Sequence, residues 1–374
     1  MPLALFNMEE NNEFISDDFN MVDSLNTTAR QVIICFQIVR LLSEKQLPES
    51  LLKDLMLSWG SEQEGENVSY KNSKGKITNT SFKHYLKLCN SLGLISEINR
   101  FYANTRLGHL FLHFIKKENN TNNIGEIQKT LFSFLLLHKD TDGFLLILDM
   151  LVDLGETNQK RLQQEFKSAI NNRLVDKKEV AIQTVKEIIS EKYRTINFIW
   201  KNAEKYAEHV LIPRVEWLIT LGWIEVNKKG SSSFYSLTNE GTKFCNLIPQ
   251  IPATVTRDIN QNWLFKNAFK SINIVNYDKN KSYFSELNDG DKNGAIGNAL
   301  TLASKIVKSS NSFRIPLWET LLFICFEHNT GQKIITEIQD VLDVLRNGMI
   351  YNDMKFLIKE EARINESYIS IRKI

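Results

Sequence analysis

One stretch of the sequence is basic and contains no acidic residue. It runs from Asn67 to Asn90, and its lysines and histidine are Lys71, Lys74, Lys76, Lys83, His84 and Lys87. Asn79 and Thr80 come just before Lys83, at a predicted helix start, where backbone N–H groups can face an anion. Proteins hold phosphate oxygens with ammonium, amide and hydroxyl groups such as these. The stretch therefore predicts a surface that binds anions, and phosphate in particular.

The spacing within this stretch predicts a helix over 81–92 with two different faces. Phe82, Leu86 and Cys89 recur at helical intervals and form the apolar face. The opposite face then holds Lys83, His84, Lys87 and Asn90. A lysine-rich face is also what any solvated helix shows. Two interpretations therefore stay open here: a binding surface, and an ordinary solvent-exposed face.

Other residues with the spacing of a chemical site lack a required neighbour. The run 75–78 imitates the end of a phosphate-binding loop, but the first glycine of that loop is missing. His109 and His113 have the spacing of metal ligands on one helix face, yet no cysteine or carboxylate accompanies them. Asp140 and Asp142 fit a helix start rather than a calcium loop, because the later ligands are absent. We therefore predict no catalytic residue, no metal site and no cofactor, and a protein that is not an enzyme.

A short pattern occurs twice in the chain. Leu92-Gly93-Leu94-Ile95 is followed by Tyr102, Thr105 and Gly108, and Leu221-Gly222-Trp223-Ile224 is followed by Tyr235, Thr238 and Gly241. In each copy the first glycine stands where a left-handed residue would end a helix, and the threonine would cap the next helix. The residues between them predict two short strands joined by a polar turn. Each copy therefore predicts a helix, a β-hairpin and a second helix.

Apolar periodicity predicts further helices around this pattern. In the first part of the chain they lie at about 32–42, from Pro48 onward and at 107–115, and the polar segment 118–123 predicts a linker. Beyond it, helices are predicted at about 127–137, 144–154, 159–170, 178–205, 212–221, 259–272, 295–308, 316–327 and 331–346. The last residues, 368–372, alternate like a strand. Helix is therefore the expected bulk of the fold.

Three helices, a two-stranded wing and a further helix form the plan of the winged helix-turn-helix superfamily. The chain resembles this superfamily twice, over about 27–117 and about 140–248. The alternative is two unrelated helix–hairpin–helix units that share the short pattern. The second copy is longer than a standard unit, and an inserted helix over 178–205 would account for the extra length.

The resemblance implies binding of double-stranded DNA, with the third helix in the major groove and the wing on the backbone or minor groove. The residues that it assigns to DNA in the first unit are Lys71, Lys74, Lys76, Asn79, Thr80, Lys83, His84 and Lys87, with Asn99 and Arg100 at the wing tip. In the second unit they are Arg214 on the third helix and Lys228 and Lys229 in the wing. Two alternatives stay open for the second unit, contact with DNA and contact with a protein, and Glu216 favours the protein because it would repel phosphate.

Composition sets the class of protein and the compartment. The chain has 374 residues, of which 43% are hydrophobic and 24% charged, and its formal net charge is +2. These values are typical of a globular protein, and they exclude a global basic field that would draw the chain onto nucleic acid. Four widely separated cysteines, each beside apolar residues, predict buried reduced thiols in the cytoplasm. No apolar run is long enough to cross a membrane, and the N-terminus does not have the pattern of a signal peptide.

The predicted fold is mostly α with short β-hairpins, in four parts. These are an acidic N-terminal arm (1–26), a first winged-helix unit (27–117), a second unit with a helical insertion (124–250) and a helical C-terminal domain (253–374). We expect double-stranded DNA and protein subunits as partners, and neither a membrane nor a small-molecule cofactor. The predicted role is that of the DNA-recognition subunit of a larger bacterial complex, in restriction or anti-phage defence, replication initiation or regulation. The alternative is a winged-helix scaffold that binds proteins without reading DNA.

Overall fold

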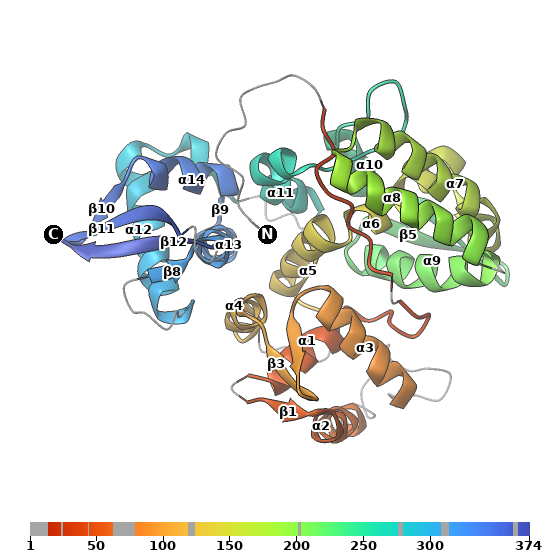
Figure 1. The fold of residues 1–374 in the computed structure, drawn as a ribbon, viewed down its shortest axis with the longest axis horizontal. Coiled ribbons are helices and arrows are strands. Elements are labelled where there is room, and N and C mark those ends of the chain that lie inside the picture. Colours follow the sequence, from red (N-terminus) through yellow and green to blue (C-terminus); the bar gives the residue numbers. More distant parts are fainter. Residues whose placement is uncertain are drawn as a thin grey trace.

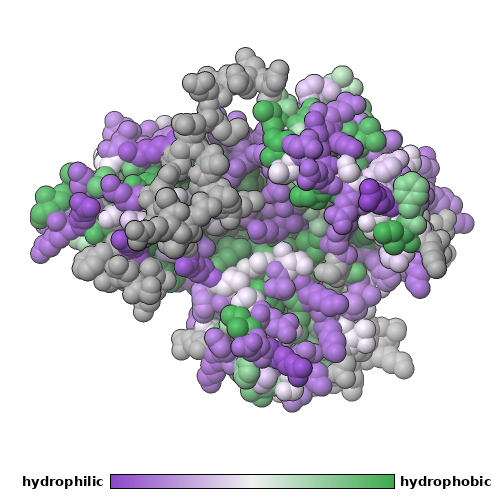
Figure 2. All heavy atoms as spheres, in the orientation of Figure 1, coloured by the Kyte–Doolittle hydropathy of each residue, from purple (hydrophilic) through white to green (hydrophobic). Residues whose placement is uncertain are grey.

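The computed structural model describes residues 14–23, 25–43, 45–62, 79–118, 124–200, 203–275, 280–307, 314–361 and 366–374. Most of this part of the chain is helical and its sheets are small, which confirms the predicted fold class. Figure 1 shows the elements gathered into three groups around one central helix, α5. In the same orientation, Figure 2 shows that hydrophilic residues cover most of this face of the molecule.

In the described residues, the first unit consists of four helices and one three-stranded sheet. Its elements are α1 (Val32–Leu41), β1 (Leu47–Pro48), α2 (Glu49–Glu62), α3 (Asn79–Ser91), β2 (Ile95–Ile98), β3 (Phe101–Asn104) and α4 (Arg106–Ile115). The strand order is β1-β3-β2, so the short strand after α1 pairs with the second strand of the β2–β3 hairpin. We call this hairpin the first hairpin.

The repeated sequence pattern has a structural cause. Gly93 ends α3 with a φ of 73°, and the Thr105 hydroxyl accepts a hydrogen bond from the Gly108 backbone N–H at 3.0 Å. A Cβ atom on Gly108 would lie 2.0 Å from the carbonyl oxygen of Leu94. Glycine is therefore needed because the start of α4 packs directly on the backbone that enters β2. Both the predicted helix stop and the predicted cap are confirmed.

The second unit repeats this order of elements. Its elements are α6 (Thr141–Leu154), β4 (Thr157–Asn158), α7 (Gln159–Val180), α8 (Gln183–Arg194), the π-helical turn η1 (Thr195–Ile199), α9 (Ala203–Thr220), β5 (Ile224–Lys229), β6 (Ser232–Leu237) and α10 (Asn239–Leu247). The strand order β4-β6-β5 matches that of the first unit. Gly222 has a φ of 80°, and a Cβ atom on Gly241 would lie 2.1 Å from the Trp223 carbonyl oxygen. We call β5–β6 the second hairpin.

The insertion of the second unit differs from the prediction. A single helix over 178–205 was expected, whereas α7 runs to Val180 and α8 begins at Gln183. The N-terminal arm occupies the break: the Ser16 N–H donates to the Val180 carbonyl and the Ile182 N–H donates to the Ser16 carbonyl, both at 3.1 Å. The prediction was wrong because a contact with a segment distant in the sequence satisfies the backbone there and separates the two helices.

The C-terminal part contains a sheet that the sequence reading largely missed. After α11 (Gln261–Val275) and β7 (Ser282–Tyr283), its elements are α12 (Asp289–Ile306), β8 (Arg314–Pro316), α13 (Leu317–Glu327), β9 (Ile334–Ile335), α14 (Ile338–Arg346), β10 (Met349–Tyr351), β11 (Met354–Glu361) and β12 (Glu366–Lys373). The helices predicted at 259–272, 295–308 and 316–327 and the strand at 368–372 are present, but the helix predicted at 331–346 begins only at Ile338, because β9 occupies Ile334–Ile335. Among the described residues the sheet has four strands in the order β10-β11-β12-β8. From α12 to β12 the chain thus follows the order of the first unit from α1 to β3 a third time, with β9 and β10 added. Gly348 ends α14 with a φ of 77°.

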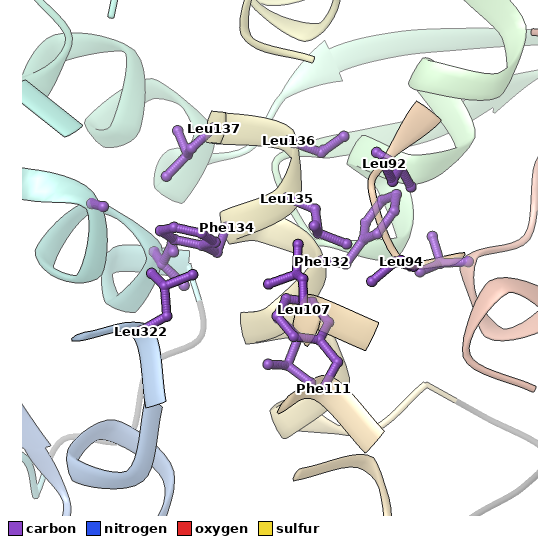
Figure 3. Close-up of a cluster of buried hydrophobic side chains, with 14 of the residues drawn as sticks. Leu92, Leu94, Leu107, Phe111, Phe132, Phe134, Leu135, Leu136, Leu137 and Leu322 are labelled. Atoms are coloured by element: carbon purple, nitrogen blue, oxygen red, sulfur yellow. The ribbon is translucent and has the colours of Figure 1, made fainter. Parts of the chain in front are cut away.

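The central helix α5 (Glu126–Lys139) joins the three units. Every residue from Thr130 to His138 is buried, which fits a helix that is apolar on all sides. The ring centres of Phe132 and of Trp217 in α9 are 5.6 Å apart, and those of Phe134 and of Phe326 in α13 are 5.5 Å apart. Figure 3 shows the same helix next to side chains of the first unit. One hydrophobic core therefore runs through all three units.

The prediction that the cysteines are buried, free thiols is confirmed. Cys35, Cys89, Cys245 and Cys325 are free and buried. None of the helices in the described ranges is both long enough and apolar enough to cross a membrane.

Candidate nucleic-acid interface

The α3 helix of the first unit has the two faces that its sequence predicts. Phe82 and Cys89 are buried against α1 and the core. Thr80, Lys83, Lys87 and Asn90 are exposed, and His84 is half-buried. Burial, followed by the charges of Lys87 and His209, lowers the pKa of His84 below its usual 6.5. At neutral pH this side chain is therefore a neutral hydrogen-bonding group between two cationic ones.

The start of α3 lies beside the first hairpin. Lys83 Nζ is 3.8 Å from Oε1 of Glu49, and 66% of the lysine side chain and 41% of the glutamate side chain are exposed. Burial, followed by the bond to Glu97, raises the pKa of Tyr102 on β3 to about 12, and the charge of Glu49 adds to this rise. Lys83 and Tyr102 thus share one acidic neighbour, which places the start of α3 and the hairpin at the same end of the unit. An exposed ion pair of this kind contributes little to stability, so a phosphate can replace Glu49 as the partner of Lys83.

The tip of the first hairpin is a tight turn. Asn99 and Arg100 are exposed and have φ values of 53° and 67°, as in the turns that join closely paired strands. The Tyr102 hydroxyl donates to Glu97 Oε2 at 3.0 Å across the hairpin. This bond ties the two strands just below the tip.

The other residues of the first unit that were predicted to bind DNA lie wholly or partly outside the described residues. Lys71, Lys74 and Lys76 lie outside the described residues. Asn79 is the first residue of α3, and its side chain also lies outside the described part.

Arg214 of the second unit does not face solvent, so its assignment to DNA was wrong. The side chain is fully buried, and its Nε donates to Asp140 Oδ2 at 2.8 Å. Its terminal nitrogens donate to Asp140 Oδ1 at 2.5 Å, to the Val210 carbonyl at 2.9 Å and to the Val22 carbonyl at 2.9 Å. A phosphate would have to displace all of these partners. Arg214 instead fixes α9 to the N-terminal arm and to the start of α6.

The outer residues of the two third helices differ in chemistry. Counting back from the glycine that ends each helix, the residues ten, six and three places earlier are Lys83, Lys87 and Asn90 in α3, and Ile212, Glu216 and Ile219 in α9. Ile212 is buried and Glu216 and Ile219 are half-buried. Trp217 Nε1 donates to the carbonyl of Ala29 at 3.0 Å, so the segment that leads into α1 packs on α9. The third helix of the second unit therefore forms part of a joint rather than an open surface.

The second hairpin remains exposed. Lys228, Lys229 and Gly230 lie at its end, and Gly230 has a φ of 64°. Lys229 pairs with Glu156 of the loop before β4, and its ammonium lies 5.2 Å from the centre of the Phe234 ring. The Asn227 amide donates to the same glutamate at 3.2 Å. These contacts hold the hairpin against the loop before β4.

A buried network of charges lies behind the second unit, and the sequence analysis did not predict it. Lys177 Nζ is 2.9 Å from both Asp142 and Asp258, and Arg173 donates to Asp142 at 2.9 Å. Burial alone would raise the pKa of Asp142, but Lys177 and Arg173 lower it below its usual value. The Asp142 carboxylate also accepts from the Asn20 N–H at 2.8 Å.

The carboxylates of this network accept from backbone N–H groups and pair with basic side chains of distant segments. Asp140 accepts from the Val22 N–H at 2.8 Å, and Arg257 pairs with Asp149 at 2.8 Å. The network thus links the N-terminal arm, α6, α7 and the segment before α11. Among the described residues no group of three or more histidine, cysteine or acidic side chains is placed to hold a metal ion. Asp140 and Asp142 do stand at the start of α6, as predicted, but a pattern within the sequence could not indicate partners so distant.

Comparisons with known proteins give little further guidance. No family model matches the chain, and no curated protein matches it. The solved structure of restriction endonuclease FokI is similar at 13% sequence identity and a TM-score of 0.31, over 95% of this chain and 63% of that one. The chain thus spans less than two thirds of that structure's length, and a similarity at this level supports no statement about what this chain does.

Proposed function

We propose that the chain binds double-stranded DNA through the first unit, with α3 in the major groove and the first hairpin on the neighbouring backbone and minor groove. The exposed polar face of α3 is the observation that carries this proposal. Lys83, Lys87 and Asn90 face solvent on the third helix of a helix–strand–helix–helix–hairpin unit. In winged-helix proteins, which this order resembles, that helix enters the major groove.

The side chains on this face suit both parts of DNA recognition. Lys83 and Lys87 supply charge for phosphates, and each phosphate contact adds about one unit to the slope of log affinity against log salt. Asn90 and Thr80 supply the amide and hydroxyl groups that read base edges. The net charge of +2 is too small to hold DNA without such a local surface. We therefore expect sequence- or structure-specific binding, with Lys228 and Lys229 of the second hairpin as secondary phosphate contacts.

A salt titration of DNA binding tests the proposal. Fluorescence anisotropy of a labelled random duplex with the full chain is expected to show binding with a steep salt slope. The double variant Lys83→Ala, Lys87→Ala is expected to weaken binding by about tenfold or more at moderate salt. Lys160→Ala with Lys167→Ala removes the same charge from an exposed face of α7 and serves as the matched control. Absence of binding at low salt, or equal weakening by both pairs, would contradict the proposal.

A second candidate function, protein binding, is favoured by the insertion of the second unit. Phe198 and Ile199 in η1 are 80% and 62% exposed, and Ile188 and Tyr193 of α8 are also exposed. Exposed apolar side chains that recur within one segment, here residues 188–199, favour a role as an interaction surface. We propose that this surface holds a protein subunit, and that the chain is the DNA-recognition subunit of a larger complex. Co-purification with the wild-type chain, compared with Phe198→Ser, tests this part separately.

A further inference from the structure

The first hairpin carries two large apolar side chains in water at its tip. Ile98 is 58% exposed and Phe101 is 44% exposed. They face each other across β2 and β3, and Asn99 and Arg100 form the turn between them. The tip therefore carries a cation in its turn and an apolar side chain on each of the two strands beside it.

These apolar residues lie on the face of the hairpin that points away from the core. Ile95, Tyr102 and Asn104 point to the core side of the hairpin and are buried, whereas Ile98 and Phe101 lie on the other side. Polar residues are what the solvent face of such a strand ordinarily carries. The hairpin is also held in one shape, because Tyr102 bonds to Glu97 and because β1 pairs with β3. Exposed apolar side chains on a stiff, tight turn are suited to insertion into another molecule.

The surrounding charges indicate which molecule this is. Arg100 stands at the tip, and Lys83 and Lys87 lie on the adjoining helix. Two acidic side chains near the tip already have partners: Glu97 accepts a hydrogen bond from Tyr102, and Glu49 forms an ion pair with Lys83. A polyanion is therefore attracted to the region. Proteins that bind the minor groove combine a basic side chain in the groove with an apolar side chain that enters a base step and kinks the duplex.

We propose that the first hairpin is a wedge for the minor groove of DNA. Arg100 enters the groove, and Phe101, supported by Ile98, inserts at a base step and unstacks it. The duplex then bends while α3 occupies the adjacent major groove. This inference rests on the proposed function, because it requires that the first unit binds DNA.

The second hairpin provides an internal contrast. At its end Lys229 pairs with Ser232 and Lys228 with Ser233 across the strands, so the tip is polar. Its exposed apolar residue, Val226, lies further from the turn and is 38% exposed. The wedge is therefore assigned to the first hairpin, and Val226→Thr on the second is the matched control.

The experiment uses the full chain and the duplex that the wild-type protein selects from a random pool. Donor and acceptor dyes at the two ends report bending, and 2-aminopurine placed at successive positions reports unstacking. The wild type is expected to shorten the end-to-end distance and to raise 2-aminopurine fluorescence at one step. Phe101→Thr is expected to lose both signals and to weaken binding several-fold without changing the salt slope. Arg100→Ala is expected to lower the salt slope by about one.

Several outcomes would overturn the wedge. They are a straight, fully stacked duplex in the wild-type complex, or bending and unstacking that persist in both Phe101→Thr and Ile98→Thr. Threonine favours strands, so the two variants give independent tests if one of them misfolds. Loss of a protein partner in Phe101→Thr with unchanged DNA bending would also overturn it. Failure of the wild type to bind any duplex would instead remove the proposed function itself, and the two failures are thus distinguishable.

Discussion

The first and second units have the same order of elements, but the outer faces of their third helices differ in chemistry and in exposure. In the first unit the third helix, α3, presents Lys83, Lys87 and Asn90 to solvent. In the second unit the corresponding residues of α9 are Ile212, Glu216 and Ile219, and the segment before α1 packs on the helix. A shared backbone plan therefore does not fix the role of a helix. The side chains on its outer face decide whether it is an open surface or a joint between units.

The largest expected effect on stability comes from removing Arg214, the buried cation that fixes α9 to the start of α6. Arg214→Met leaves the Asp140 carboxylate buried without its cation, and removing one member of a buried pair costs about 3–5 kcal/mol. The free energy of unfolding, measured by urea denaturation, is expected to fall by that amount. DNA affinity at low temperature, where the variant stays folded, is expected to be unchanged. A loss of less than about 1 kcal/mol, within the range of an exposed pair, would show that Arg214 is not the anchor of the second unit.

Alanine substitutions at Gly108 and Gly241 test whether both units need the same close approach of a helix to the backbone before the hairpin. Gly108→Ala and Gly241→Ala each force a Cβ atom against a backbone carbonyl, at 2.0 Å and 2.1 Å in the present structure. Overpacking of this kind costs about 1–3 kcal/mol, and we expect similar losses in both units in thermal and urea denaturation. Gly294→Ala in α12 meets no atom within 4 Å and is the control, expected to be neutral or slightly stabilising. If one of the two glycines tolerated alanine, the close approach would not be common to both units.

Exchanging the charges of the two third helices tests the functional difference between them. Lys87→Glu gives α3 the residue that α9 has at that position, and it is expected to weaken DNA binding by about tenfold, which corresponds to about 1.4 kcal/mol. The reciprocal Glu216→Lys is expected to leave DNA affinity nearly unchanged, because α9 is part of a joint. Anisotropy titrations at several salt concentrations measure both. A clear gain of affinity from Glu216→Lys would mean that the second unit also offers its third helix to DNA.

The smallest effect is expected at the second hairpin. Lys229→Ala removes an exposed pair with Glu156, which contributes little to stability, and it removes one phosphate contact at the edge of the proposed interface. Urea denaturation and the salt slope are expected to change less than in Arg214→Met and in the Lys83, Lys87 double variant. A larger loss of affinity than that of the double variant would reverse the order of importance of the two units.

Local features of the fold were predictable because they depend on neighbours in the sequence. Gly93 and Gly222 end α3 and α9, and Thr105 and Thr238 cap the next helices, α4 and α10, as the spacing indicated. The apolar and polar faces of α3 also follow from a helical period. Predictions failed where a distant segment intervened. The break between α7 and α8 is filled by Ser16, and the sheet of the C-terminal part depends on pairing of β8 with β12.

The sequence by itself determined most of the helices, the turns of the first and second hairpins, the caps and the two-faced pattern of α3, since each of these is decided over a few residues. Only the tertiary structure decided which charges face water. Arg214 and Lys83 both stand on third helices, yet Arg214 finds its partners in Asp140 and Val22. A charged group is buried only when such partners surround it, and they come together only when the chain has folded. For the same reason the central helix α5 could be predicted as a helix, but not as the element that joins three units.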